Sequence, residues 1–171
     1  MIKIISIITI LIISSTALAD SITMEDAFSP HQGATELVVK TIGEAKKSIN
    51  VASYSFTSRP IASALAAAHD RGIDVEVVLD KSDKSEQRGW IVHFLQDHKI
   101  PARLNYKYHI MHDKFMVIDD STLQLGSFNY TRAAEDNNAE NVLVIHGAGK
   151  LAKDYCKQWE KLWKESEQNH D

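Results

Sequence analysis

Helical and strand patterns alternate along most of this chain, and this alternation limits the possible folds more than any other feature. The clearest helix covers residues 60–71, with Pro60 in its first turn and Gly72 just past its end. Further helical stripes lie at 34–48, 90–95 and 151–162, and apolar strand segments lie at 49–54, 75–79, 114–118, 122–125 and 142–145. Helices between strands predict an α/β domain, with a mixed sheet packed between helical layers.

The length and composition fit one globular domain. The chain has 171 residues, of which 44% are hydrophobic, so it can bury a real core. One cysteine, Cys156, permits no intrachain disulfide, and it lies in an amphipathic helical segment with no local partner. A lone cysteine of this kind is more often a packed hydrophobe than a nucleophile. The formal net charge of −4 does not by itself indicate a surface for nucleic acid.

The amino terminus has the pattern of a secretory signal. Lys3 precedes an apolar run at 4–13, and Ala17-Leu18-Ala19 forms a small-x-small cleavage site. We therefore expect a signal peptide at 1–19 and a mature domain at 20–171, exported to the periplasm or secreted. The apolar run would make a helix of about 15 Å, against a bilayer core of about 30 Å. No stable membrane span is expected after cleavage, and an uncleaved anchor is the alternative.

The segment at 112–129 concentrates the chemistry. Two apolar stretches flank the turn signal Asp119-Asp120-Ser121, which predicts a β-hairpin. Side chains alternate between the faces of a strand, so His112 and Lys114 share one face. Asp119 falls on the other face, and we expect it to cap the turn or to brace the site from behind.

These residue types suit phosphodiester chemistry. A neutral imidazole can attack phosphorus and hold the phosphoryl group covalently, which makes His112 a candidate nucleophile. Lys114 supplies a compact positive charge for the phosphate oxygens, and Ser127 and Asn129 add neutral donors. Glu140 could accept a hydrogen bond from the distal nitrogen of His112 and so fix its tautomer.

Other interpretations of the same residues were weighed. His109, His112 and Asp113 might suggest a metal site, but His109 and His112 face opposite ways on a strand and Lys114 would repel a cation. We therefore expect no metal and no cofactor. In isolation, Ser127 and Asn129 would be turn residues. Glu140 lies in a short acidic run that is usually a solvated loop.

The full pattern resembles the signature of the phospholipase D superfamily: His112-x-Lys114-x4-Asp119, then Gly126-Ser127-x-Asn129. Tyr54-Ser55-Phe56-Thr57, Ala27-Phe28-Ser29-Pro30 and Glu140 further resemble its branch of small bacterial nucleases, and the similarity extends over residues 24–165. The resemblance implies a phospholipase D-like nuclease fold and a metal-independent phosphodiesterase. It implies that His112 attacks phosphorus, that a second histidine protonates the leaving oxygen, and that Lys114 and Asn129 bind phosphate. It further implies that Ser127 assists and that Glu140 orients His112, with Asp119 as the remaining member of the motif.

The motif occurs once in this sequence, whereas the family usually has two copies in one long chain. One copy cannot supply both the nucleophile and the general acid. We therefore expect a homodimer whose two-fold axis passes through a shared active site.

The sequence constrains the substrate less than it constrains the reaction. The leading hypothesis is a non-specific endonuclease on DNA or RNA. Two basic clusters, Lys81, Lys84 and Arg88, and Arg103, Lys107 and Arg132, could bind phosphates, and Tyr106, Tyr108 and Tyr130 could stack on bases. Each set is equally well explained by ordinary surface or packing. A phospholipase D acting on lipid head groups is the alternative enzyme, and a binding module that has lost catalysis is the alternative class.

Overall fold

The computed structural model describes residues 21–84 and 89–168, so the predicted signal peptide at 1–19 lies outside the described residues. The strands are β1 (Thr23–Ser29), β2 (Ser48–Ser53), β3 (Asp74–Asp80), β4 (Ala102–Asn105), β5 (Lys114–Ile118), β6 (Thr122–Gly126), β7 (Glu140–His146) and β8 (Glu167–Gln168). The α-helices are α1 (Ala34–Gly43), α2 (Arg59–Asp70), α3 (Trp90–Asp97), α4 (Arg132–Asp136) and α5 (Gly149–Lys164), and a 3₁₀ turn covers Lys81–Lys84.

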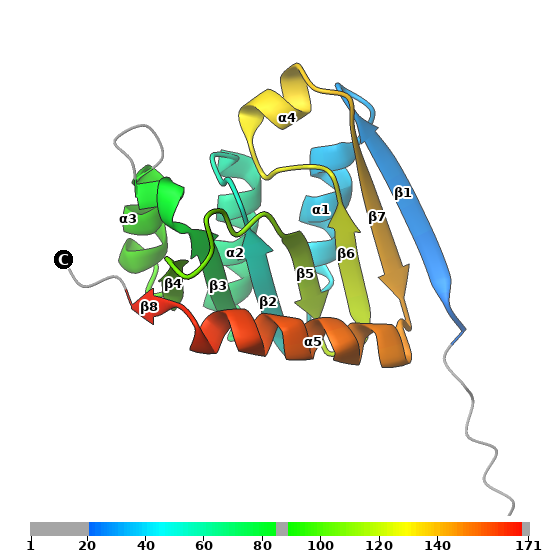
Figure 1. Ribbon diagram of the computed structural model, residues 1–171. Helices are drawn as coiled ribbons and strands as arrows, with labels where there is room; N and C mark the ends of the chain where they lie inside the picture. The colour runs from blue at the N-terminus through cyan, green and yellow to red at the C-terminus, as the bar shows by residue number, and fades with distance from the viewer. Residues whose placement is uncertain (1–20, 85–88, 169–171) are drawn as a thin grey trace, which may run out of the picture.

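The strands form one mixed sheet in the order β1-β7-β6-β5-β2-β3-β4-β8 (Figure 1). Strands β2, β3 and β4 run parallel and are linked through α2 and α3, while β5, β6 and β7 form an antiparallel meander. The two parts join where β5 pairs antiparallel with β2. As a result, the ends of β2 and β6 and the starts of β5 and β7 meet at one edge of the sheet, which we call the upper edge.

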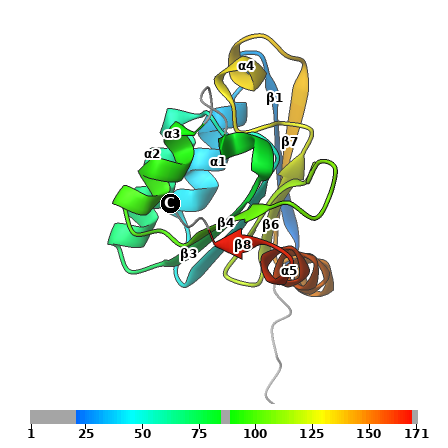
Figure 2. The same cartoon turned by 60° about the vertical axis from the view of Figure 1, so that its left-hand side comes forward.

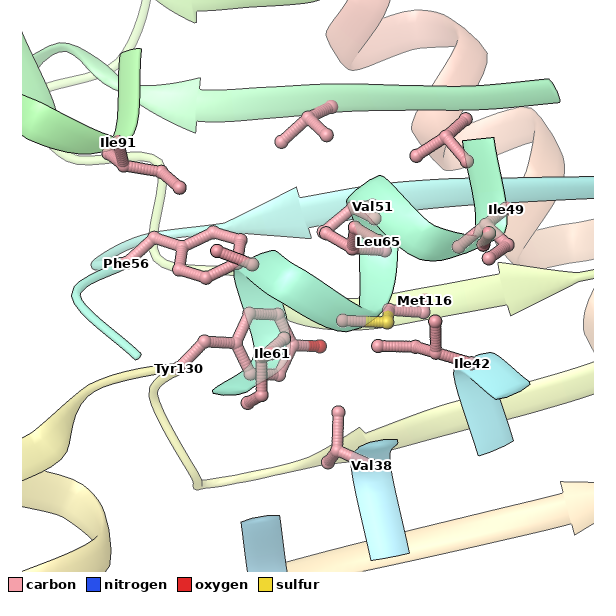
Figure 3. Packing of buried hydrophobic residues seen from close by; sticks show 14 of the residues in the cluster. Val38, Ile42, Ile49, Val51, Phe56, Ile61, Leu65, Ile91, Met116 and Tyr130 are labelled. Carbon is pink, nitrogen blue, oxygen red and sulfur yellow. The ribbon is translucent and has the colours of Figure 1, made fainter. Parts of the chain in front are cut away.

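Helices cover both faces of the sheet, as the alternation of segments predicts. Helices α1, α2 and α3 lie on one face, and α5 crosses the other (Figures 1 and 2). Figure 3 shows the larger core, where Val38 and Ile42 of α1 and Ile61 and Leu65 of α2 pack toward the sheet. The α5 face has its own core, in which the Trp159 indole N–H donates to the Val51 carbonyl at 2.9 Å.

Strand β5 shows the alternation most directly. Met116 and Ile118 belong to the core under α1 and α2, whereas Phe115 and Val117 belong to the core under α5. The hairpin with β6 forms with Phe115 opposite Leu125 and Ile118 opposite Thr122. The predicted mixed sheet between helical layers and the predicted hairpin are therefore confirmed.

Some boundaries differ from the sequence-based expectation. The first helix ends at Gly43 rather than at residue 48, because the next backbone N–H groups, from Lys46 to Ser48, donate to the Asp119 carboxylate. Strands β1 and β4 were not predicted. Strand β1 is an edge strand with four exposed residues and little apolar periodicity, and it acquires its conformation by pairing with β7.

Candidate active site

A pocket of about 620 Å³ opens at the upper edge of the sheet. His112, Lys114, Ser127, Asn129 and Glu140 all line it. They come from the segment before β5, from the start of β5, from the loop after β6 and from the start of β7. Five of the six predicted site residues are thus brought together by strand ends that meet at one edge.

His112 is exposed and lies two residues before β5, so no ladder hydrogen bond holds it. Its neighbours fix the backbone instead. The Met111 N–H donates to Oδ2 of Asp80 at 2.7 Å, and the Asp113 carbonyl accepts from the Tyr54 N–H at 3.0 Å. The imidazole is therefore presented to solvent from a segment anchored on both sides.

Lys114 lies against His112. Its Nζ is 3.0 Å from Nδ1 of His112 and donates to the His112 carbonyl oxygen at 2.6 Å. Partial burial lowers the pKa of Lys114, while Asp113 and Glu140 act in the opposite direction. An ammonium partly stripped of water is well suited to hold the oxygens of a bound phosphate.

Ser127 and Asn129 follow β6 in a loop rather than lying in a strand. Ser127 exchanges two hydrogen bonds with Asn141: its N–H donates to Oδ1 at 3.2 Å, and its Oγ accepts from the Asn141 N–H at 3.1 Å. Asn129 is half-buried, and its Oδ1 is buried without a hydrogen-bond partner. Because an amide oxygen only accepts, a phosphate oxygen in this pocket could pair only with the Nδ2 group of Asn129.

The loop can approach β7 because residue 126 is glycine. Gly126 has φ +151°, and a Cβ at this position would lie 2.1 Å from the Asn141 carbonyl oxygen. Any other residue would push the two strands apart and move Ser127 out of the pocket.

Glu140 lines the pocket but does not bond to His112 in this arrangement. Its Oε1 accepts from Nδ2 of Asn138 at 3.1 Å, while Nδ1 of His112 lies beside the Lys114 ammonium. Glu140 still acts on the site through its charge, which favours the protonated form of Lys114. Its role in orienting the imidazole stays a prediction.

Asp119 lies outside the pocket, at the opposite end of β5. Its Oδ1 accepts from the N–H groups of Lys47 and Ser48 at 2.7 and 3.0 Å, and its Oδ2 accepts from the Lys46 N–H at 2.9 Å. The carboxylate therefore caps the entry to β2 at the lower edge of the sheet rather than the hairpin turn, and it does not bond to the imidazole.

Two residues at the site were not predicted. Asp80 is fully buried at the end of β3 and holds the segment before His112 through Met111. In the sequence, Asp80 could have been recognised as a candidate because its carboxylate ends an apolar strand segment. Tyr54 belongs to the quoted Tyr54-Ser55-Phe56-Thr57 segment, and its ring lies 4.4 Å from the His112 ring between centroids. Nothing in the local sequence indicates that contact.

The three tyrosines predicted to stack on bases differ in their exposure and contacts. Tyr130 is completely buried and its hydroxyl donates to Oε1 of Gln124, so it cannot stack on a base. The Tyr108 hydroxyl donates to Glu165 at 2.8 Å, whereas Tyr106 keeps 45% of its surface exposed. The expectation for Tyr130 is corrected to core packing, because its ring packs edge-on against Phe56.

The predicted basic clusters are largely engaged within the protein. Lys81 donates to the Tyr108 carbonyl and Arg103 to the Trp163 carbonyl, while Lys107 pairs with Glu165 and Arg132 with Asp136. Arg88 lies outside the described residues. Most of these cations therefore have partners within the protein.

Within residues 21–84 and 89–168, no three histidine, cysteine, aspartate or glutamate side chains come together in a way that could hold a metal ion. The Cys156 Sγ donates at 3.4 Å to Asp120, which is distant in the sequence, so the expectation of no local partner is unaffected. Burial is the main cause that raises the pKa of this thiol, to about 11.

Comparison with known proteins agrees with this geometry. The family model described as "Cardiolipin synthase, PLD-like domain" matches residues 38–163. The chain therefore belongs to the phospholipase D-like family. A protein named phospholipase D from Rickettsia bellii is 37% identical over 132 residues, and a mitochondrial cardiolipin hydrolase from Xenopus laevis is 31% identical over 131 residues. The matches span 77% of this chain but only 65% and 61% of those two relatives.

Two solved structures agree in fold, and the match covers the whole length of both. The crystal structure of Nuc, a phospholipase D family member from Salmonella typhimurium, is 34% identical and superposes with a TM-score of 0.85, over 88% of this chain and 100% of Nuc. NucT from Helicobacter pylori shares the fold at 24% identity, with a TM-score of 0.77.

Proposed function

We propose that this protein is a metal-independent phosphodiesterase that works through a covalent phosphohistidine on His112, with DNA or RNA as its substrate. One observation carries the proposal. The pocket collects an exposed imidazole, a partly desolvated ammonium and a carboxamide, from His112, Lys114 and Asn129, around a space that fits a phosphate.

The reaction has two displacements. Attack needs the His112 tautomer that carries its proton on Nδ1, so the Lys114 ammonium, which can only donate, must turn from Nδ1 to the phosphate oxygens when substrate binds. Nε2 then attacks phosphorus with its lone pair, and the bond from phosphorus to the leaving oxygen breaks. A second, protonated imidazole gives its proton to that oxygen. A water molecule then gives a proton to the same imidazole while attacking phosphorus, the P–N bond breaks, and a phosphate monoester leaves. Lys114 and Asn129 stabilise the charge on the non-bridging oxygens throughout.

The second imidazole is best supplied by another copy of the chain. The sequence carries the motif once, and His112 is exposed at the rim of its own pocket. Ile110, two residues earlier, keeps 45% of its surface exposed, which leaves apolar surface beside His112 for a partner to cover. We propose that the two copies meet at this rim, with Ile110 in the contact and both His112 side chains in one active site.

The shared site has a quantitative test. Wild-type subunits and His112→Ala subunits are mixed in known ratios, exchanged in mild denaturant and refolded. If each active site needs two His112 side chains, activity falls with the square of the wild-type fraction. A linear fall would contradict the shared site. Ile110→Asp should shift the protein to monomers in sedimentation velocity, with loss of activity.

Nucleic acid is favoured over lipid for two reasons. The chain matches Nuc over the whole length of that protein, but only 65% of the length of the Rickettsia bellii phospholipase D. The pocket is also open and lined mainly by polar and charged groups, which suits a phosphate backbone better than acyl chains. The phospholipase alternative draws support from the names of the curated relatives and from exposed Ile110 and Tyr106 before His112.

One assay separates the candidates. The purified protein is incubated with plasmid DNA, an RNA oligonucleotide, phosphatidylcholine vesicles and a small aryl phosphodiester, each with and without EDTA. His112→Ala should abolish turnover, whereas His93→Ala, which removes an exposed histidine on α3, should not. DNA or RNA cleavage with EDTA supports the nuclease, and choline release alone supports the phospholipase. Binding without turnover would indicate an inactive module, and activity lost only with EDTA would contradict the metal-free mechanism.

Export is part of the proposal. Among the described residues no helix combines the length and apolar character needed to cross a membrane. Amino-terminal sequencing of protein from the periplasm or the medium should begin at Asp20. A sequence that begins at Met1 would indicate an uncleaved anchor.

A further inference from the structure

Tyr54 lies where it can control the reactive pair. It directly follows β2, and its N–H donates to the Asp113 carbonyl at 3.0 Å, which extends the pairing of Ser53 with Lys114. This fixes the Tyr54 backbone relative to the segment that carries His112. The side chain is half-buried, so its ring cannot swing freely into solvent.

The ring contacts both members of the pair. Its centroid lies 4.4 Å from the His112 imidazole centroid at an interplanar angle of 55°, and 5.2 Å from Nζ of Lys114. Lys114 Nζ is in turn 3.0 Å from Nδ1 of His112. The three groups therefore form one contiguous unit, in which an aromatic face supports an imidazole and an ammonium together.

The ring supports the pair from behind. Among the described residues, the lining of the pocket includes His112 and Lys114 but not Tyr54. The Tyr54 hydroxyl makes no hydrogen bond to another described residue, so the phenyl face is the part of the side chain that acts. Because Tyr54 does not reach the phosphate site, its effect on a reaction there must pass through His112 and Lys114.

We infer that Tyr54 is a positioning residue, whose ring holds the His112 imidazole in the one rotamer that aims Nε2 at phosphorus and keeps the Lys114 ammonium beside it. The inference rests on the proposed function. An exposed histidine without such support would distribute over the staggered χ1 wells, only one of which is reactive. The charged groups around His112 are Asp113, Lys114, Glu140 across the pocket and Lys161 of α5. None of them presents a flat surface that packs against the imidazole, as the Tyr54 ring does.

The test compares three variants by steady-state kinetics on the substrate identified above. Tyr54→Leu removes the aromatic face, and kcat should fall about 10- to 100-fold, with KM changed by less than about threefold. Tyr54→Phe keeps the face and should retain kcat within about threefold. Phe94→Leu is the matched control, because it removes an aromatic ring stacked on His98 at 4.2 Å, on α3. It should leave kcat unchanged.

A second readout needs no substrate. The imidazole C–H resonances of His112, identified by their loss in His112→Ala, should change position in Tyr54→Leu and stay near the wild-type position in Tyr54→Phe, because the ring current of an aromatic ring at 4.4 Å shifts them. If Tyr54→Leu unfolds, Tyr54→Met serves in its place. Wild-type kcat in the Leu variant, an equal loss in the Phe variant, or unmoved resonances would overturn the inference. A wild-type protein that cleaves no phosphodiester would instead refute the proposed function, and the resonances would still test the ring contact.

Discussion

The buried carboxylate of Asp80 accepts a hydrogen bond from the backbone N–H of Met111 at 2.7 Å, and so fixes the residue immediately before His112. The other oxygen of Asp80 accepts from the Ser82 N–H at 2.9 Å. The end of a parallel strand thus positions a side chain that belongs to the antiparallel half of the sheet. A residue that never touches substrate can in this way set the position of the reacting nitrogen.

Replacing Asp80 should therefore impair both stability and turnover. Asp80→Ala leaves two N–H groups without an acceptor, so the free energy of unfolding should fall by about 1.5–3 kcal/mol in urea titration. The segment before His112 would loosen, and kcat should fall at least about tenfold at a temperature where the variant is folded. Asp74→Asn, an exposed carboxylate at the other end of β3, is the control. Undiminished kcat in Asp80→Ala would show that the anchor is dispensable.

Replacing Asp119 should lower stability but leave turnover unchanged. Its carboxylate accepts three backbone N–H groups ahead of β2, so Asp119→Ala should lower the free energy of unfolding by about 1.5–3 kcal/mol. Asp119→Asn keeps one acceptor oxygen and tolerates the left-handed backbone at φ 53°, so its loss should be smaller. Because the side chain lies at the far end of β5, kcat per folded molecule should stay within about twofold of wild type. A large loss of kcat without loss of stability would return Asp119 to the active site.

Gly126 offers a test of the close approach between β6 and β7. Gly126→Ala places a methyl group where the Asn141 carbonyl lies 2.1 Å away, so we expect a loss of about 1–3 kcal/mol in unfolding free energy and a fall in activity as Ser127 shifts. Gly43→Ala has nothing within 4 Å and ends α1, so the same change there should be neutral or stabilising by up to about 1 kcal/mol. Equal effects at the two positions would contradict the steric argument.

The lowered pKa of Lys114 predicts an early alkaline limit. Burial disfavours the ammonium form and lowers the pKa of Lys114. The side chain therefore loses its proton at a lower pH than an ordinary lysine, whose pKa is near 10.4. The neutral amine cannot neutralise phosphate, and kcat/KM should therefore fall as the pH rises through that lowered value. In Lys114→Arg the guanidinium stays protonated, so any remaining activity should lack this limit. A pH profile of kcat/KM for both proteins decides, and an unchanged alkaline limit in Lys114→Arg would assign it to another group.

Much of the fold could be predicted because it depends on local periodicity. Strand β5 was predicted over residues 114–118 and is found there, because alternate residues feed two separate cores. The same alternation placed Asp119 off the face that carries Lys114. The helix over 60–71 was predicted within one residue at each end, because Pro60 and Gly72 mark its limits in the sequence itself.

The contacts that complete the site could not be predicted, because they join residues far apart in the chain. Asp80 reaches Met111, and Tyr54 reaches His112, only because β2 lies between β3 and β5 in the sheet order. Periodicity gives no strand order and no register. The contacts of Glu140 could not be predicted for a similar reason: its carboxylate accepts from Asn138, and Lys114 lies beside Nδ1 of His112, so the bond from Glu140 to the imidazole stays a prediction.

Strand β5 has five residues and crosses the sheet from its upper edge to its lower one. Lys114 is its first residue, and Asp119 is the residue that follows it. At about 3.3 Å per residue, the two side chains are rooted about 16 Å apart. The fixed spacing between these two residues of the motif therefore matches the length of the strand. Lys114 lies at the proposed phosphate site, and Asp119 holds the entry to the neighbouring strand β2. Inserting or deleting a residue between them would break both attachments at once, whereas exchanging the apolar residues within the interval would disturb only the packing.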